Sequence, residues 1–470
     1  MFARTAIAAL LAATALTACT AGPDYARPRI QAEAAAPFIG TDKSDAVTAA
    51  QPIAQWWRQY DDPLLDRLVA DALAANTDIR IALARIEKAR SSLRGAKSDR
   101  SPSTDLQGSA TYGRVPESQA PAGVDREGRT VDAGISIGYE VDLFGRVRRG
   151  VEAARGDYEA AQADADATRL TIAADTVRAY FDATTASESA AVARRTVALL
   201  DDNMRITGAR ERRGLADRID VIRVMQLRER QAADIPTYDA ARDAALFRIA
   251  TLTGRTPRQL PAELTGAVTT PALSSPLPVG DGQSLLARRP DIRAAERRLA
   301  ADTARIGVAT ADLYPRITLG GSVGTTAVGA TDIFSGGPFR WLLGPLISWA
   351  FPNQEAIRAR IDSATADSHA DLAAFDGAVL GALEETETAL SAYRNAMRRE
   401  VVLGQARDAA ERAAKASRAR QRVGEIDFLA VLDAERTLAA AQSDHIAARR
   451  ATAFAQVDLF RALAGGWEAE

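Results

Sequence analysis

Apolar residues recur along this chain with two different periods, and the longer period predicts unusually long helices. Between residues 357 and 393, apolar or small side chains recur about every 3.6 residues, which keeps one face of a straight helix against its neighbours. A similar alternation of three and four residues begins at Val151. Helices over about residues 147–210 and 353–420 would each be on the order of 90 to 100 Å long. Such helices exceed what a globular domain requires and suit a cylinder of packed helices.

Four other segments alternate small or polar residues with apolar ones, which predicts strands. We expect two β-hairpins, with strands at about 104–114 and 130–144, and at about 316–328 and 339–351. Each strand has about the length needed to cross hydrocarbon at a tilt, roughly 9 to 11 residues. Soluble hairpins packed on helices would show the same alternation. Aromatic residues lie in or beside the strands, as in interfacial girdles: Tyr112, Tyr139, Phe144, Tyr314, Trp341, Trp349 and Phe351.

The whole pattern occurs twice in the chain. The segment "NTDIRIALARIEKARSSLRGAKSDRSP" from residue 76 is echoed by "RPDIRAAERRLAADTARIGVATADLYP" from residue 289. A connector rich in proline and serine, "TTPALSSPLPVGDG", separates the two halves. We therefore expect a tandem duplication, each copy running helix, hairpin, long helix, break, helix. The first repeat covers residues 61–265, a linker covers 266–282, and the second repeat covers 283–465.

A short motif interrupts each predicted long helix near its end. The segments "RRGLADRIDVIRVMQ" and "RVGEIDFLAVLDAERT" share a glycine, an aspartate three residues later and then an apolar run. Gly214 and Gly424 would let the chain turn, and Asp217 and Asp427 are placed to cap the helices that follow. Because this motif occurs in both halves, it indicates a specific turn rather than an irregularity in one helix.

Two hairpins supply four strands, which cannot form a closed barrel alone. An open four-stranded sheet in lipid would leave unpaired backbone groups that cost several kcal/mol each. Barrels of a single chain begin at about eight strands. Copies of the chain must then share one barrel, and simple closure permits a dimer with 8 strands or a trimer with 12. These residues alone do not choose between the two.

The N-terminus has the pattern of an export signal over residues 1–18, with an apolar segment too short to span a bilayer. The tetrad "LTAC" that ends at Cys19 resembles a bacterial lipobox, which would make Cys19 the acylated first residue of the mature protein. Cys19 is the single cysteine of the sequence, so it can form no disulfide within the chain. Lipidation explains it better than an incidental cysteine does, and residues 19–60 become a lipidated N-terminal segment.

Charge and motif content argue against several classes of function. The 59 basic and 61 acidic residues give a net charge of −2, without the basic excess of a nucleic-acid partner. The pattern "GISIG" around Ser136 matches a nucleophile elbow, but it lies in an alternating strand and lacks a histidine partner. The two histidines, His369 and His445, are isolated and predict no metal site. We expect no enzyme, no cofactor and no metal.

Several features together resemble the TolC-like outer-membrane efflux proteins. They are the lipobox, the segment "QWWRQYDDPLLDRLVADALAANTDI" at 55–79, the duplicated plan and the G-x-x-D-x-x-x-V-L-D-A-E run at 424–435. The lipoproteins that serve resistance-nodulation-division (RND) pumps are the best fit. The resemblance implies a mainly α fold with a membrane β-barrel portion. Three chains would form a 12-stranded β-barrel in the outer membrane and a 12-helix periplasmic α-barrel.

The same resemblance implies a function, a location and partners. The homotrimer would be lipid-anchored in the outer membrane, in contact with outer-membrane lipid, with a long periplasmic extension. It would receive small molecules from an inner-membrane RND pump through a periplasmic membrane-fusion adaptor and export them passively. A channel for type I protein secretion would have the same fold. A structural periplasmic lipoprotein without a pore is a further alternative, although it leaves four membrane-length strands unexplained.

The resemblance also implies a gate at the periplasmic tip of the tunnel, where acidic residues project into the pore. The corresponding residues in this sequence are Asp220 and Asp433. The second repeat has Ala430 where some relatives have another acid. Asp217 and Asp427 are candidates either for the gate or for helix caps.

Overall fold

The structure is a computed structural model, and its described residues fall into two compact units, each built from both repeats. The strand unit comprises the residues up to Pro28 with Arg85–Gln162 and Ala294–Asp376. The helical unit comprises Arg29–Ala84, Ala163–Arg293 and the residues from Gly377 onwards. The predicted export signal and Cys19 lie outside the described residues. The described residues are 20–39, 47–116, 118, 125–265, 270–271, 273, 276–328 and 339–464.

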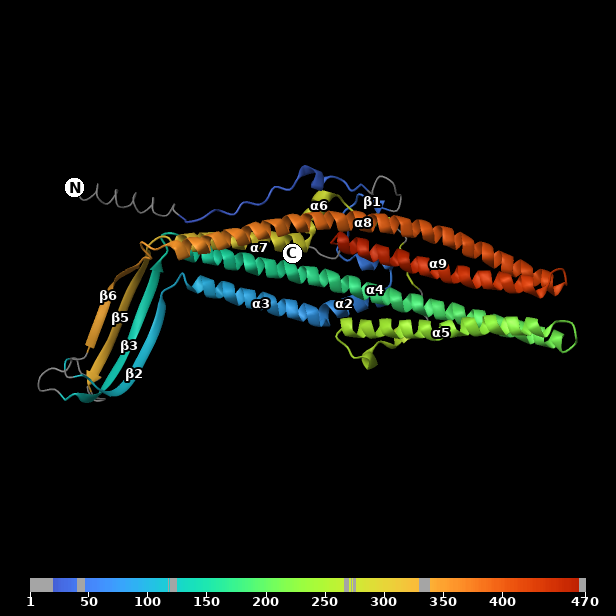
Figure 1. Cartoon of the computed structure of the whole chain (residues 1–470), viewed down its shortest axis with the longest axis horizontal. Coiled ribbons are helices and arrows are strands. Elements are labelled where there is room, and N and C mark those ends of the chain that lie inside the picture. Colours follow the sequence, from blue (N-terminus) through green and yellow to red (C-terminus); the bar gives the residue numbers. More distant parts are fainter. Residues whose placement is uncertain are drawn as a thin grey trace. The chain divides into compact units, whose positions relative to one another are not determined.

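The strand unit contains a four-stranded antiparallel sheet with the order β2-β3-β5-β6 (Figure 1). The two hairpins of the two repeats therefore join into one sheet through β3 and β5. The strands are β2 (Ser103–Arg114), β3 (Glu127–Val141), β5 (Arg316–Val328) and β6 (Phe339–Ser348). A two-stranded parallel pair, β1 (Val47–Thr48) with β4 (Leu277–Pro278), belongs to the helical unit.

β3 and β6 end earlier than the alternating pattern alone suggests. The pattern continues to residues 144 and 351, whereas the strands end at Val141 and Ser348. Asp142 lies directly after β3, and its carboxylate accepts hydrogen bonds of 3.0 and 2.8 Å from two of the first amides of α4. The capping interaction draws the chain away from the sheet, so it ends the strand before the apolar alternation does.

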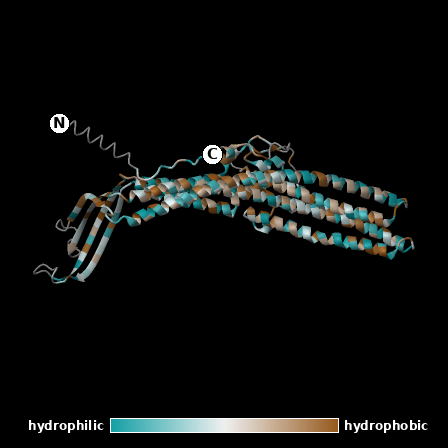
Figure 2. Ribbon diagram, turned by 45° about the horizontal axis from the view of Figure 1, so that its top comes forward, coloured by the Kyte–Doolittle hydropathy of each residue, from teal (hydrophilic) through white to brown (hydrophobic). Residues whose placement is uncertain are grey.

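The strand register places apolar side chains on one face of the sheet. Leu106, Ile135, Val323 and Trp341 are aligned in a single row across all four strands. Leu106 is 79% exposed and Trp341 is 71% exposed, so none of the described residues covers these side chains. Figure 2 shows hydrophobic residues along these strands. An exposed apolar surface of this kind indicates contact with lipid or with another chain.

The opposite face of the sheet is mainly polar, although β6 places Leu342 and Leu346 on it. This polar face carries its own ion pair. Arg340 of β6 lies 2.7 Å from Asp132 of β3, and Thr326 of β5 donates a hydrogen bond of 2.6 Å to the same carboxylate. Within the described residues, β2 and β6 each pair with one neighbouring strand only. The sheet thus has two free edges, which present unpaired backbone groups to a further strand.

Helices make up most of the rest, and matching helices in the two repeats have equal or nearly equal lengths. α4 has 66 residues and α8 has 68, or about 100 Å each at 1.5 Å per residue. α3 and α7 have 22 residues each, and α5 and α9 have 35 each. The prediction of two repeats with long helices is confirmed. The helices are α2 (Pro63–Ala75), α3 (Thr77–Ser98), α4 (Arg146–Glu211), α5 (Arg218–Leu252), α6 (Gly282–Arg288), α7 (Pro290–Ala311), α8 (Glu355–Arg422) and α9 (Phe428–Ala462).

Among the described residues, no helix combines the length and the hydrophobicity that crossing a bilayer requires.

An aromatic cluster forms the core of the helical unit. Trp56 is completely buried and stacks on Phe460 of α9, with the ring centroids 4.6 Å apart. Tyr60 packs edge-on against Phe181 of α4 at 5.1 Å, and its hydroxyl donates a 3.0 Å hydrogen bond to Gln456. The short segment before α2 therefore joins helices from both repeats, which explains the two adjacent tryptophans in the sequence.

Candidate functional site at the helix turns

The candidate site lies at two turns, one joining α4 to α5 and the other joining α8 to α9. Gly214 and Gly424 adopt left-handed backbone conformations there, with φ of 70° and 78°. The amide of Leu215 donates to the carbonyl of Arg210 at 2.9 Å, and the amide of Glu425 reaches the equivalent carbonyl of α8 at 3.0 Å. These bonds end both long helices in the same way. Glycine stands at both turns because only glycine reaches this left-handed conformation without steric cost.

Asp217 and Asp427 cap the two helices that follow the turns. The Asp217 carboxylate accepts a hydrogen bond from the amide of Ile219 at 2.8 Å, and the Asp427 carboxylate accepts one from the amide of Ala430 at 2.9 Å. Both residues have the extended backbone typical of an N-cap. In this structure, both carboxylates are engaged with the backbone of the helix that each begins.

Aligning the two turns on their caps shows that the predicted gate residues occupy different levels. Asp220 is the third residue of α5, whereas Asp433 is the sixth residue of α9. Ala430 stands where α5 has Asp220, and Arg223 stands where α9 has Asp433. Three residues correspond to about 4.5 Å along a helix. In an assembly with the two turns at equal height, the carboxylates would therefore form two tiers rather than one ring.

Arg223 is a charged neighbour of Asp220 that the sequence reasoning missed. Its guanidinium lies 3.6 Å from the Asp220 carboxylate, and the two side chains are 42% and 21% exposed respectively. The spacing of three residues on one helix face was the available signal. Asp433 is also exposed, and it has no ion pair within the described part of the chain. The first turn therefore presents a partly neutralised carboxylate and the second an unpaired one.

Glu435 lies two residues beyond Asp433 and is buried between α8 and α9. Its side chain is 4% exposed, and its carboxylate is 3.2 Å from the Nε atom of Arg418. Burial raises the pKa of Glu435, and the positive charge of Arg418 opposes that rise. The two acids thus differ in environment: Asp433 faces solvent, whereas Glu435 is buried between two helices.

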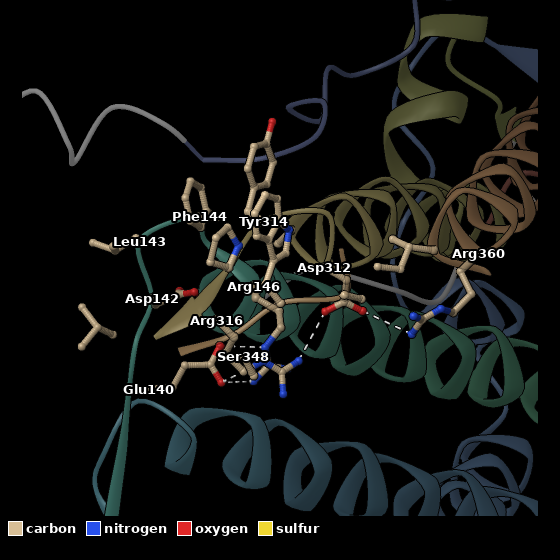
Figure 3. Close-up of a pocket in the computed structure, with 16 residues that line it drawn as sticks. Glu140, Asp142, Leu143, Phe144, Arg146, Asp312, Tyr314, Arg316, Ser348 and Arg360 are labelled. Atoms are coloured by element: carbon tan, nitrogen blue, oxygen red, sulfur yellow. Dashed lines mark hydrogen bonds and ion pairs between the residues drawn. The ribbon is translucent and has the colours of Figure 1, made fainter. Parts of the chain in front are cut away.

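A second polar cluster lies in the strand unit, where strands give way to helices (Figure 3). It surrounds a cavity of about 460 Å³. Arg146 at the start of α4 makes two hydrogen bonds, of 2.8 and 2.7 Å, to Glu140 of β3. Asp312 lies 3.3 Å from both Arg316 and Arg360. Each arginine of this cavity has a carboxylate partner, so the cluster joins strands to helices and leaves no cation over for a ligand.

The structure also locates the candidates for other chemistry. Ser136 lies inside β3, opposite Asp105 of β2 and Ser322 of β5, rather than at a turn between a strand and a helix. His369 lies in α8 and His445 in α9. In the described residues, no group of His, Cys, Asp and Glu side chains could hold a metal ion.

Comparison with known proteins places both repeats in one family. The sequence profile described as "Outer membrane efflux protein" matches residues 68–255 and again residues 282–465. The chain is 30% identical over 475 residues to the outer membrane protein OprJ of Pseudomonas aeruginosa, covering 98% of this chain and 96% of OprJ. It is 29% identical over 472 residues to the probable efflux pump outer membrane protein TtgC of Pseudomonas putida, covering 97% and 95%.

A solved structure extends this similarity to three dimensions. The outer-membrane channel OprN superimposes on this chain with a TM-score of 0.88 at 37% sequence identity, covering 96% of this chain and all of OprN. The likeness includes both the strands and the long helices, since almost the whole chain is aligned. The resemblance inferred from the tryptophan segment and the repeated turn motif is therefore confirmed.

Proposed function

The chain belongs to the outer membrane efflux protein family, and we propose on that premise that it is the outer-membrane channel of a tripartite efflux pump. One observation carries the proposal: the four-stranded sheet has an exposed apolar face and two free edges. Lipid would cover that face, and further copies of the chain would pair with the edges. The names of OprJ, TtgC and OprN, which refer to the outer membrane, to an efflux pump and to a channel, support the same assignment.

We propose a homotrimer, in which β6 of each copy pairs with β2 of the next. Two copies would close a barrel of eight strands, and the side chains of such a barrel fill its interior. Three copies give 12 strands and a wider lumen, lined by the polar face that carries Asp132 and Arg340. The four longest helices of each copy, α4, α5, α8 and α9, would continue that lumen into the periplasm. A lipid on Cys19 would add an anchor in the same membrane.

Transport through such a conduit is passive and requires no catalytic residue, cofactor or metal. We propose that an inner-membrane RND pump and a periplasmic adaptor deliver small molecules to the helical end. A type I secretion channel is the second candidate, because the fold is the same for both. The similarity to a named efflux pump protein over 97% of the chain favours efflux. A structural lipoprotein without a pore would not require a sheet with one polar and one apolar face.

At the helix turns, we propose a constriction whose charge is set by three side chains of each copy. Asp220 and Asp433 supply two negative charges, and Arg223 supplies one positive charge. Gathered around one axis, unpaired carboxylates attract cations and repel one another. Asp433 would provide most of the attraction for cations, since the carboxylate of Asp220 already forms an ion pair with Arg223.

The assembly can be tested by measuring the mass of the purified full chain in detergent, by native mass spectrometry or by light scattering corrected for detergent. We expect three chains of about 50 kDa each, since the unprocessed chain is 49.9 kDa. A stable dimer would contradict the 12-stranded barrel. A monomer in lipid nanodiscs would contradict the channel itself, because a lone four-stranded sheet cannot satisfy its edges in hydrocarbon.

A further inference from the structure

A second cavity in the strand unit, distinct from that of Figure 3, has a different balance of charge. It measures about 560 Å³ and lies between the end of α3, the end of β3 and the start of α4. α3 runs beside α4 in this region (Figure 1). Its basic lining residues are Lys97, Arg100, Arg148 and Arg155. Its acidic lining residues are Asp99, Glu140, Asp142 and Glu152.

Three of the four acidic side chains around this cavity already have partners. Glu140 is held by Arg146 through two hydrogen bonds of 2.8 and 2.7 Å. Asp142 accepts from the first backbone amides of α4 at 3.0 and 2.8 Å. Glu152 is shared by two arginines of α4, the nearer being Arg149 at 2.8 Å. None of the three is free to neutralise a further cation.

The remaining charges do not balance. Lys97, Arg100 and Arg155 are exposed and have no ion pair within the described residues, and Asp99 is the single acidic lining residue left without a partner. Three free cations thus face one free carboxylate. A local excess of basic groups around a cavity favours a ligand that carries negative charge.

The apolar face of the sheet begins where this cavity ends. Tyr139 lines the cavity and, through its register with Leu319, belongs to the same face as Ile135 and Ile137. These side chains are partly exposed in the single chain. The order from sheet to helix is therefore apolar residues, then a tyrosine, then lysine and arginine. Membrane proteins show this order where hydrocarbon meets the lipid headgroups.

We propose that Lys97, Arg100 and Arg155 bind the phosphate of an anionic phospholipid headgroup at the periplasmic surface of the outer membrane. The acyl chains would lie along the apolar face beyond Tyr139. This site rests on the proposed function, because it requires the sheet to lie in the membrane. The continuity with the apolar face favours a lipid over free phosphate, which has no apolar part to place there.

Native mass spectrometry of the full chain in detergent tests the site directly, with added phosphatidylglycerol as the anionic lipid and phosphatidylcholine as the zwitterionic one. The test variant combines Lys97→Gln, Arg100→Gln and Arg155→Gln. The matched control removes one lysine and two arginines that are also exposed and unpaired in the described residues: Arg85→Gln, Lys88→Gln and Arg195→Gln.

We expect the test variant to lose affinity for phosphatidylglycerol and the control to keep it. Each basic residue near an anionic lipid contributes about fivefold at low ionic strength, so three give a loss on the order of 100-fold. Binding of phosphatidylcholine should not change. If the test variant fails to assemble, each single substitution is measured instead, with a loss of about fivefold expected.

Equal losses in the test and control variants would overturn the site, as would equal retention of phosphatidylglycerol in the test variant and the parent. Displacement of the lipid by an equimolar amount of inorganic phosphate would assign the cavity to free anions instead. Planar-bilayer recordings of the same samples separate this question from the proposed function. We expect normal channel steps from the test variant. Absence of steps from the parent protein would contradict the proposed channel function but not the lipid binding measured by mass spectrometry.

Discussion

The ion pair between Arg223 and Asp220 leads to a quantitative prediction for the variant Arg223→Ala. At a separation of 3.6 Å, two unit charges in water attract by about 1 kcal/mol. Exposed pairs contribute about 0.2 to 1 kcal/mol to stability, so the variant should remain folded and lose less than about 1 kcal/mol. Its main effect is therefore electrostatic, because each copy loses one positive charge beside a carboxylate.

The freed carboxylate should increase the preference of the channel for cations. A cation that takes the place of the guanidinium gains about 1 kcal/mol, which corresponds to about fivefold higher local occupancy. The reversal potential across a planar bilayer under a KCl gradient reports this preference. We expect a shift towards the cation potential at about 0.1 M salt that shrinks at about 1 M, where the screening length falls from about 10 to about 3 Å.

Arg218→Ala is the matched control for this experiment. Arg218 is the first residue of α5 and has no ion pair within the described residues. It precedes Asp220 by two residues, about 200° around the helix. The control removes the same charge from the same turn but leaves the carboxylate paired. Equal shifts from Arg223→Ala and Arg218→Ala, or none from Arg223→Ala, would show that the carboxylate freed at Asp220 does not set the preference for cations.

Three further predictions concern stability. Trp56→Ala should lower the free energy of unfolding by about 3 to 5 kcal/mol, measured by denaturant titration, because Trp56 is fully buried against Phe460; a loss below about 1 kcal/mol would contradict the aromatic core. Asp217→Ala should cost about 1 kcal/mol and speed amide exchange in the first turn of α5, whereas Asp217→Asn should restore most protection; equal exchange in both variants would show that the cap is unimportant. Burial raises the pKa of Glu435 above its ordinary value of 4.5, so the folded state favours the protonated side chain. The resulting contribution to the free energy of unfolding is complete below pH 4.5 and is lost as the pH rises through the native pKa. Glu435→Gln should therefore raise the Tm at about pH 8 but leave it unchanged at about pH 4; a gain at both pH values would exclude titration as the cause.

The periodic parts of the fold could be predicted from sequence because each depends on neighbours along the chain. The expected helix at 147–210 is observed as Arg146–Glu211, since the helical period persists throughout it. The end of β3 was less predictable, because Asp142 binds amides of α4 and redirects the chain. Local caps decide such boundaries, and an alternating pattern does not contain them.

The charge environment of the sites was harder to predict than the elements that carry them. The family resemblance implies Asp220 and Asp433 as gate residues, but their different levels emerge only when the caps are aligned. Arg223 was within reach of sequence reasoning, since it lies three residues from Asp220 on one helix. Lys97 and Arg155 come together only through the packing of α3 beside α4, so no local pattern marks them.

If copies of this chain form a gated pore, the purified protein should carry single-channel current in planar bilayers. We expect discrete current steps from the parent protein. We expect larger steps from the variant that combines Asp220→Ala with Asp433→Ala, because shorter, uncharged side chains widen the constriction and no longer retain cations in it. Asp202→Ala, which removes a carboxylate from a similar ion pair on α4, should leave the steps unchanged. Unaltered steps in the double variant would remove these residues from the gate. No current from any of the three, in protein verified to be inserted, would contradict the channel.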